Sequence, residues 1–232
     1  MSVAAVILAA GRGERLGHDL PKAFVPLAGK PVLLRALEAM AAVQEIDCIL
    51  PVVAASELGH YRRVASALGA EPRLAEPALG GAERQDSVRA GLEALPREAS
   101  LVAIHDAARP LVRVAAVARV LATARREGAA ILAFPVADTL KIVRDGRVIA
   151  TPERAHCYAA QTPQVFRVEL LREALAKADA EGRLASDDAQ LVEWLGAPVA
   201  IVEGDPDNLK LTHPEDFAVA ERLLAAREGQ PA

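Results

Sequence analysis

Cysteine is scarce in this sequence, and so are aromatic residues. The chain has two cysteines, Cys48 and Cys157, which lie far apart without a Cys-x-x-Cys spacing, and aromatic residues make up 3% of it. Two isolated thiols argue against a disulfide framework and are typical of a reducing compartment, so we predict a cytoplasmic protein. The five histidines show no metal-ligand spacing, and we predict no metal site built from protein side chains alone.

A strong excess of charge of one sign is also missing. The formal net charge is −4 and charged residues make up 25% of the chain, which gives no reason to expect a nucleic-acid partner. The run Val3–Leu8 is too short to span a membrane, and no basic segment precedes it as in a signal peptide. We therefore expect no membrane partner, and any polyanion must bind at a local basic site.

The chain does have a regular alternation of apolar runs and amphipathic stretches. The expected strands are Val3–Leu8, Cys48–Ala54, Leu101–His105, Ala130–Phe134 and Val199–Val202. The expected helices are Val32–Ala42, Tyr61–Leu68, Gln85–Leu95, Val114–Arg126, Val168–Ala178, Ala189–Leu195 and Pro214–Ala226. This alternation predicts an α/β fold with a Rossmann-like, mainly parallel sheet flanked by helices. With 52% hydrophobic residues, residues 1–232 are expected to form a single domain.

Residues 136–166 interrupt the alternation because they show no helical pattern. The run LKIVRDGRVIAT contains two short β-prone segments around Asp145-Gly146, a dipeptide that favours a two-residue hairpin turn. A segment of this length is rarely plain loop in a compact domain. We predict a β-hairpin arm at about residues 136–160 that projects from the sheet.

A glycine-rich loop with positive charge, LAAGRGERLGHDLPKAF (Leu8–Phe24), follows the first expected strand. Gly11 and Gly13 let backbone N–H groups approach an anion closely, and Arg15 and Lys22 can neutralise phosphate charge. The loop lacks the Gly-Lys-Ser or Gly-Lys-Thr of a Walker A motif, and its third glycine falls one position late for a dinucleotide fingerprint. The loop leaves the carboxyl end of a strand, where ligands of open α/β sheets bind, and the added Arg15, Pro21 and Lys22 favour phosphate binding over a plain surface loop.

Six further motifs follow along the chain: GGAERQDSV (Gly80–Val88), HDAARP (His105–Pro110), ADTLK (Ala137–Lys141), QTPQVF (Gln161–Phe166), SDDA (Ser186–Ala189) and DNLKLT (Asp207–Thr212). Together with the loop, in this order and spacing, they resemble the 2-C-methyl-D-erythritol 4-phosphate cytidylyltransferase family of the isoprenoid precursor pathway. Each motif alone is weak evidence, whereas the combination spans nearly the whole chain and is highly specific.

The resemblance implies three sets of site residues. The nucleotide-binding residues are Ala9, Ala10, Gly11, Gly13, Gly81, Ala82, Ser87 and Ala107. The residues that contact the acceptor polyol phosphate are Asp106, Arg109, Thr139, Thr162 and Ser186. The catalytic residues are Arg15 and Lys22 at the nucleotide, with Arg154 and Lys210 at the acceptor phosphate.

The resemblance also implies a reaction in which CTP and 2-C-methyl-D-erythritol 4-phosphate give the CDP-linked polyol and pyrophosphate. The nucleophile is a phosphate oxygen that is already ionised at neutral pH, so we expect no general base, and none at His105. We expect Mg²⁺ to bind mainly through the CTP phosphates, with Asp106 as the only outside candidate for a protein ligand. A two-fold homodimer joined through the arm is implied as well, with Arg154 directed toward the partner's acceptor site.

Three alternatives remain open from the sequence. A sister enzyme would use ribitol 5-phosphate as the acceptor, although HDAARP favours methylerythritol phosphate. A Rossmann dehydrogenase would bind NAD, which the late third glycine argues against. A non-catalytic nucleotide sensor would bind CTP without releasing pyrophosphate, and it would have little use for Lys22, Arg154 and Lys210 together.

Overall fold

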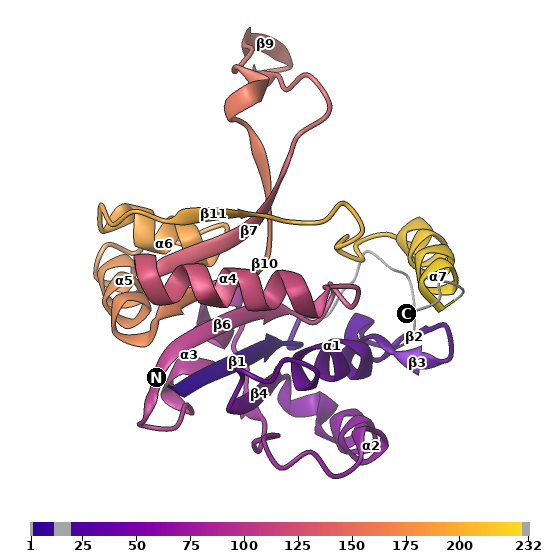
Figure 1. Ribbon diagram of the computed structural model, residues 1–232. Coiled ribbons are helices and arrows are strands. Elements are labelled where there is room, and N and C mark those ends of the chain that lie inside the picture. Colours follow the sequence, from indigo (N-terminus) through magenta and orange to yellow (C-terminus); the bar gives the residue numbers. More distant parts are fainter. Residues whose placement is uncertain (1, 12–19, 229–232) are drawn as a thin grey trace.

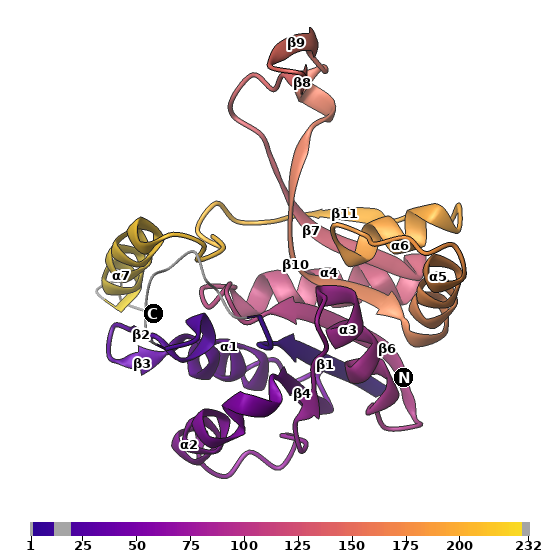
Figure 2. The ribbon, with the colours of Figure 1, turned by 180° about the vertical axis from the view of Figure 1, so that it is seen from behind.

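The fold is built on a seven-stranded, mainly parallel sheet. The computed structural model describes residues 2–11 and 20–228. The strands lie in the order β11-β7-β10-β6-β1-β4-β5 (Figures 1 and 2). Their bounds are β1 Ser2–Leu8, β4 Cys48–Val53, β5 Ala78–Leu79, β6 Ala99–Asp106, β7 Ala129–Pro135, β10 Tyr158–Arg167 and β11 Ala200–Glu203. Within this sheet β10 is antiparallel to both neighbours and the other pairs are parallel, which confirms the predicted α/β class.

Helices cover both faces of this sheet (Figures 1 and 2). The helices of the chain are α1 Val32–Ala41, α2 Leu58–Leu68, α3 Arg84–Glu93, α4 Val114–Glu127, α5 Val168–Ala180, α6 Asp188–Trp194 and, beside the sheet, α7 Pro214–Glu228, with short 3-10 turns η2 Lys22–Phe24, η3 Ala55–Glu57 and η4 Arg154–His156. Side chains of α1, α2 and α4 join one core cluster, and those of α3, α5 and α6 join another. All seven expected helices are present, with boundaries that differ by a few residues.

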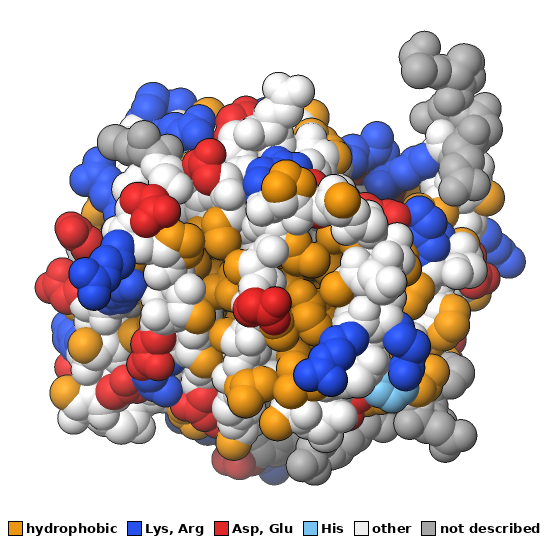
Figure 3. Space-filling model, turned by 90° about the horizontal axis from the view of Figure 1, so that it is seen from below, with side chains coloured by type: hydrophobic (Ala, Val, Ile, Leu, Met, Phe, Trp, Pro, Cys, Tyr) orange, Lys and Arg blue, Asp and Glu red, His pale blue; other side chains and the backbone are white. Residues whose placement is uncertain are grey.

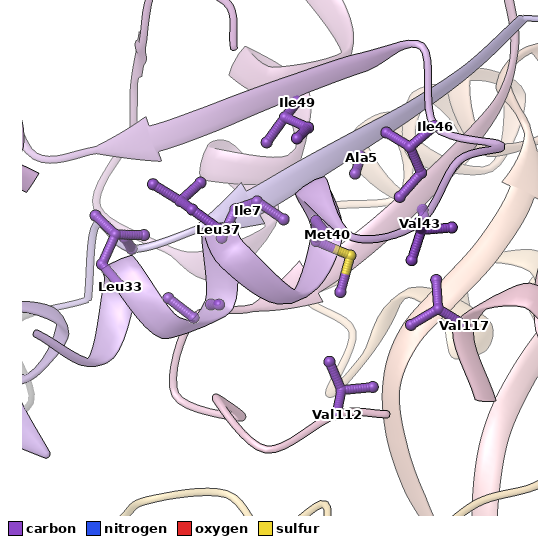
Figure 4. Close-up of a cluster of buried hydrophobic side chains, with 14 of the residues drawn as sticks. Ala5, Ile7, Leu33, Leu37, Met40, Val43, Ile46, Ile49, Val112 and Val117 are labelled. Carbon is purple, nitrogen blue, oxygen red and sulfur yellow. The ribbon is translucent and has the colours of Figure 1, made fainter. Parts of the chain in front are cut away.

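Successive residues of β1 belong to the two different cores. Ala5 and Ile7 pack under α1, whereas Ala4 and Val6 pack under α3, because neighbouring side chains of a strand point to opposite faces. A strand buried on both sides must be apolar throughout, which explains the continuous run near the start of the chain. Figure 4 shows the α1 side of this core, where Leu33, Leu37 and Met40 gather around β1, together with Val43, Ile46, Ile49, Val112 and Val117.

The last helix packs beside the segment that follows the glycine-rich loop. A small hairpin, β2 Pro26–Leu27 and β3 Lys30–Pro31, follows η2, and α7 lies next to it (Figure 1). The apolar side chains between them are Leu27, Val32, Leu111, Leu211 and Ala220. This third cluster fixes the exit of the loop against the end of the chain.

The strand β10 was absent from the predicted strands. It carries Gln161, Thr162, Pro163 and Gln164 in its middle, which do not read as a sheet interior, and its register shifts between Ala160 and Gln164. Gln161, Thr162 and Gln164 are nevertheless buried, and a hydrogen-bond partner for each, described below, offsets the cost of burying its polar group. The short strands β2, β3 and β5 were also not predicted.

The predicted hairpin arm is present and projects from the body (Figures 1 and 2). Its strands are β8 Ile142–Arg144 and β9 Arg147–Ala150, which form a separate two-stranded sheet among the described strands. Asp145 and Gly146 both have positive φ, of 50° and 72°, as a two-residue turn of this kind requires. The prediction that this dipeptide forms the turn is therefore confirmed.

The face seen in Figure 3 lies on the side of α2 and β4 in Figure 1. Hydrophobic side chains gather in its middle, and Lys or Arg and Asp or Glu side chains are interspersed around them. Within residues 2–11 and 20–228, no helix is long and apolar enough to cross a membrane.

Candidate active site

A cavity of about 240 Å³ opens at the edge of the sheet where β6, β7 and β11 end and β10 begins. We call it the acceptor cavity. Its lining residues are Arg84, Asp106, Arg109, Ala160, Gln161, Thr162, Gln164, Ser186, Asp187 and Lys210. They come from α3, β6 and the turn after it, β10, the start of α6, and the segment between β11 and α7. Its location agrees with the rule that ligands bind beyond the carboxyl ends of parallel strands.

Five of the residues predicted from the sequence meet in this cavity. They are Asp106, Arg109, Thr162, Ser186 and Lys210. The first and last are 104 positions apart in the chain (106 to 210), yet Lys210 Nζ lies 2.6 Å from Asp106 Oδ2. The fold therefore assembles one site from segments that the sequence keeps separate.

Asp106 lies at the centre of the charge distribution. Its side chain is 10% exposed, and Arg84 Nε lies 3.2 Å from the oxygen that Lys210 leaves unoccupied. Burial alone would raise the pKa of this carboxyl, but the two cations outweigh burial and hold the pKa well below its ordinary value. Asp106 is therefore a carboxylate with both oxygens paired to cations.

Arg84 reaches a second carboxylate in the same place. Its Nη1 and Nη2 donate to the two oxygens of Asp188 at 2.8 and 2.7 Å, in the bidentate geometry that guanidinium and carboxylate share. The Asp188 side chain is only 1% exposed, and burial raises its pKa even though Arg84 opposes that change. Gln164 Oε1 accepts from the backbone N–H groups of Asp188 and Ala189, which fixes the start of α6 at the cavity.

His105 is fully buried and makes two hydrogen bonds. The Arg109 carbonyl can only accept, so His105 Nε2 carries the ring proton and donates to it at 3.1 Å. Nδ1 of the neutral ring then accepts from the Thr162 hydroxyl at 3.0 Å, and the same hydroxyl accepts from the Asp106 N–H at 3.1 Å. Burial lowers the pKa of His105 to about 4, so the ring is neutral at pH 7.

Arg109 and Asn208 fix the segment that carries Lys210. Arg109 Nη1 donates to the Asn208 carbonyl at 2.7 Å, and its Nη2 donates to the Ala160 carbonyl at 3.1 Å. The buried Asn208 amide donates to the Thr162 carbonyl at 3.0 Å. The turn after β6, the first half of β10 and the DNLKLT segment are therefore held together by hydrogen bonds.

Of the residues predicted to bind the nucleotide, Ala9, Ala10 and Gly11 follow β1, Gly81 and Ala82 lie between β5 and α3, Ser87 lies in the first turn of α3, and Ala107 follows β6. A side chain at Gly80 would collide with Cβ of Ala10 and would lie 2.7 Å from the Ser87 hydroxyl. The glycine-rich loop, the GGAERQDSV segment and the start of α3 therefore touch one another. Gly80 is required here because only glycine permits this approach.

Backbone hydrogen bonds limit which groups of this region can bind a ligand. The N–H of Ala9 donates to the Val52 carbonyl at 2.8 Å, and the N–H of Ala107 donates to the Leu8 carbonyl at 3.0 Å. The backbone N–H groups of the loop that can bind an anion therefore begin at Ala10. A ribose at Ala107 would meet its carbonyl rather than its N–H.

The turn before α3 is held by its own side chains. Glu83 and Asp86 form a capping box, in which the Glu83 N–H donates to Asp86 at 3.0 Å. A side chain at Gly81 would collide with Asp86. This turn, which includes Ala82, is consequently kept in one conformation by α3.

Comparison with known proteins adds independent information to this geometry. Residues 3–226 match the model of the family described as IspD, 2-C-methyl-D-erythritol 4-phosphate cytidylyltransferase. The chain belongs to this family. A relative with that name from Pelotomaculum thermopropionicum is 44% identical over 230 residues, which are 98% of this chain and 96% of the relative.

Two solved structures support the same assignment. The cytidylyltransferase from Thermus thermophilus is 40% identical, with a TM-score of 0.76 over 97% of this chain and all of that one. The 4-diphosphocytidyl-2C-methyl-D-erythritol synthase from Anaerococcus prevotii is 30% identical, with a TM-score of 0.87 over 97% and 96% of the two chains. The predictions of a cytidylyltransferase and of this family are confirmed.

Some residues expected in an IspD site do not line the acceptor cavity of this single chain. Thr139 and Arg154 are exposed in or near the arm, where Arg154 Nη1 donates to the Ala137 carbonyl at 2.7 Å. Gly13 and Arg15 lie outside the described residues. Lys22 begins η2, at the exit of the glycine-rich loop.

Sequence reasoning missed Arg84 and Asp188 as site residues of this IspD chain. Both lie inside motifs named above, GGAERQDSV and SDDA, but an arginine in the first turn of a helix is usually exposed to solvent. Only the fold shows that Arg84 of α3 and Asp188 of α6, 104 positions apart, lie face to face.

Among the residues that the structure describes, no group of three or more His, Cys, Asp or Glu side chains is placed to hold a metal ion.

Proposed function

We propose that this chain transfers the CMP group of CTP to the phosphate of 2-C-methyl-D-erythritol 4-phosphate and releases pyrophosphate. The observation that carries this proposal is the acceptor cavity, which gathers five residues predicted from the family motifs. The nucleotide would lie across the contact between Ala10, Gly80 and Ser87, next to Ala107. The acceptor would fill the cavity beside it, so that its phosphate faces the α-phosphate of CTP.

Charge neutralisation is the main task of such a site. The attacking phosphate oxygen needs no base, and the neutral, doubly hydrogen-bonded His105 offers none. Two unit charges held 4 Å apart repel each other by about 4 kcal/mol at an effective dielectric constant of 20. Preorganised cations that offset this repulsion, together with in-line positioning, can account for the catalysis.

The roles of individual residues follow from charge. We assign Arg15 and Lys22 to the α-phosphate and the leaving pyrophosphate, where negative charge develops. Lys210 and Arg109 would bind the acceptor phosphate from the cavity wall. Asp106 repels a phosphate, so it would accept a hydrogen bond from a polyol hydroxyl and hold Lys210 in place. Ser186 is exposed at the rim and would contact the polyol. Thr162 directs its hydroxyl proton to His105, and we expect it to shape the cavity.

Mg²⁺ would accompany CTP. Both oxygens of Asp106 are paired with cations, so this carboxylate is poorly suited to a metal unless those pairs open. This donor set fits an ion held mainly by the triphosphate oxygens. When bound, the ion would offset triphosphate charge, while Arg15 and Lys22 would position the phosphates.

We also propose a cytoplasmic homodimer joined through the arm. Six hydrophobic side chains of the arm are between 37% and 60% exposed, namely Leu140, Ile142, Val143, Val148, Ile149 and Tyr158. A lone two-stranded hairpin is marginally stable in water, so a second copy is the favoured surface for these side chains. Arg154 and Thr139 would then reach the acceptor site of the partner.

Pyrophosphate release from CTP with a panel of polyol phosphates tests the reaction. We expect turnover with 2-C-methyl-D-erythritol 4-phosphate and much slower turnover with ribitol 5-phosphate, which is a control because the comparisons do not favour that acceptor. Faster turnover with ribitol 5-phosphate would overturn the acceptor. Binding of CTP without pyrophosphate release from any acceptor would overturn the reaction and favour a nucleotide sensor.

A further inference from the structure

Arg84 occupies an unusual place for the first residue of a helix. Its side chain is 30% exposed and lies between Asp188, which it pairs with through both terminal nitrogens, and Asp106, which its Nε contacts at 3.2 Å. Lys210 contacts the other oxygen of Asp106 at 2.6 Å. The result is a continuous row of charges, Asp188–Arg84–Asp106–Lys210, of which the last three line the acceptor cavity. Of these four residues, only Asp106 and Lys210 have a role in the function proposed above.

We propose that Arg84 is a positioning residue that shares the charge of Asp106 and thereby keeps Lys210 available for the acceptor phosphate. The proposal rests on the proposed function of the cavity. Three carboxylates, Asp106, Asp187 and Asp188, lie in the cavity wall or directly behind it, and without Arg84 the cations among the described lining residues would be Lys210 and Arg109. With Arg84 present, three cations balance these three anions, so the wall has no net negative charge to repel an entering phosphate, and Asp106 has a second cation besides Lys210.

The fork of an arginine is needed for this arrangement. The two terminal nitrogens meet the oxygens of Asp188 while the remaining nitrogen still reaches Asp106, so one side chain holds two carboxylates in fixed directions. A lysine has a single charged nitrogen on a flexible stem. At position 84 it would pair with the more deeply buried Asp188, and Asp106 would be left to Lys210 alone.

Arg84 also links the two halves of the site. It follows directly on the turn that contains Gly80 and Gly81, and the capping box of Glu83 and Asp86 fixes its backbone. Its guanidinium reaches the acceptor side, whereas its backbone belongs to the nucleotide side. Substitution of Arg84 is therefore expected to weaken acceptor use while CTP use, which depends on the backbone turn, changes little.

The variants Arg84→Lys and Arg89→Lys form a matched pair for the test. Arg89 lies on the same helix, and it also makes an ion pair to another helix, with Asp179 of α5 at 2.5 Å, but it does not line the cavity. In steady-state assays with both substrates, we expect Arg84→Lys to raise the KM for the acceptor about tenfold and to lower kcat about tenfold, with the KM for CTP within about threefold. Arg89→Lys should leave all three parameters within about twofold. Equal behaviour of the two variants would overturn the proposal.

A second variant guards against an effect of folding alone. Asp188→Asn retains Arg84 and removes the carboxylate that anchors it, so we expect the same selective defect in the KM for the acceptor. A rise in both KM values together, in proportion to a lowered Tm, would mean that the network only supports the fold.

Labelling of Lys210 tests the charge sharing without any turnover. Lysine acylation followed by peptide mass spectrometry would compare Lys210 with Lys30, which has a similar exposure of 49% against 44% and a similar ion pair, to Glu38 at 2.7 Å. In Arg84→Lys we expect Lys210 to react severalfold more slowly than in the parent, because Asp106 then holds it alone, while Lys30 is unchanged. An unchanged or faster reaction of Lys210 would overturn the proposal. If the parent releases no pyrophosphate with the acceptor, the proposed function fails, and the labelling result still decides the role of Arg84.

Discussion

The acceptor cavity and the arm differ in what surrounds their side chains. Asp106 and Arg84 in the cavity wall, and Asp188 behind it, are each held by charged partners of the same chain. In the arm, Val143 and Val148 are 57% and 60% exposed, and the hairpin pairs with no strand of the body. These ion pairs of the body are satisfied within one chain, whereas the arm leaves hydrophobic side chains exposed. The difference agrees with the proposal that the body places most of the charges of the site and that the arm joins two copies of the chain.

The largest effects should come from the cations of the body. We expect Lys22→Ala, and likewise Arg15→Ala, to lower turnover by roughly 10²–10³, because each removes one preorganised charge from the developing pyrophosphate. Oligomeric state and Tm should not change. Lys30→Ala is the control, since Lys30 makes an exposed ion pair close by, and we expect at most a twofold change. Near-normal turnover in both loop variants would refute the assignment of the loop.

Changes in the arm should have an intermediate effect on rate and a large one on assembly. A chain with both Ile142→Asp and Val148→Asp should sediment as a species of 24.4 kDa instead of twice that mass, since charges cannot be buried in the proposed interface. Turnover should fall by about 10- to 100-fold, the cost of losing one charged contact from Arg154.

The control for the arm is Leu184→Asp, which places a charge on an exposed leucine of the body that is 66% exposed. We expect this variant to keep both mass and turnover. An arm variant that is monomeric and fully active would break the link between assembly and catalysis.

The smallest effect on turnover is expected at His105, which we expect to affect stability at low pH rather than the reaction. We expect His105→Gln to keep turnover within about threefold, because glutamine can accept from Thr162 and donate to the Arg109 carbonyl. The pKa of His105 is lowered from 6.5 to about 4 in the folded chain. The unfolded chain therefore binds more protons between these values, and stability is lost as pH falls from 6.5 toward 4.

The pKa shift of His105 limits how much stability the folded chain can lose between pH 6.5 and pH 4. A shift of this extent corresponds to at most about 3 kcal/mol of the free energy of unfolding near pH 4. In denaturant titrations from pH 7 to pH 4, His105→Gln should lose correspondingly less stability than the parent. His156→Gln, an exposed histidine of the arm, should behave as the parent does. A parallel pH profile for His105→Gln and the parent would contradict the burial argument.

The sequence was sufficient for the elements with strong local patterns. The apolar run of β1, the amphipathic α1 and the Asp145-Gly146 turn are each specified by neighbouring residues, and the structure contains all three. The strand β10 was not predictable in this way. Its Gln164 is buried only because Asp187 and the start of α6 lie across from it, and these residues are more than twenty positions away.

The site shows the same limit. Asp106, Arg109 and Lys210 could be named because their motifs resemble those of the family, and an Asp at a strand end with an Arg three residues later also suits a polar ligand. The role of Arg84 could not be named, because it depends on Asp188 of another helix. A buried carboxylate needs a charged partner, and the sequence does not show that Asp188 is buried. Local patterns predict elements and polar clusters, whereas long-range ion pairs require the fold.

The account depends most on the claim that the arm of one chain completes the acceptor site of another. Subunit exchange tests this claim directly, by mixing Arg154→Ala chains with Lys22→Ala chains, each nearly inactive alone. If Arg154 acts in the partner's site, a mixed dimer contains one doubly defective site and one intact site. Equal mixing then gives half mixed dimers, and we predict recovery of about one quarter of the parent's pyrophosphate release. No recovery in a sample with verified mixed dimers would contradict the account.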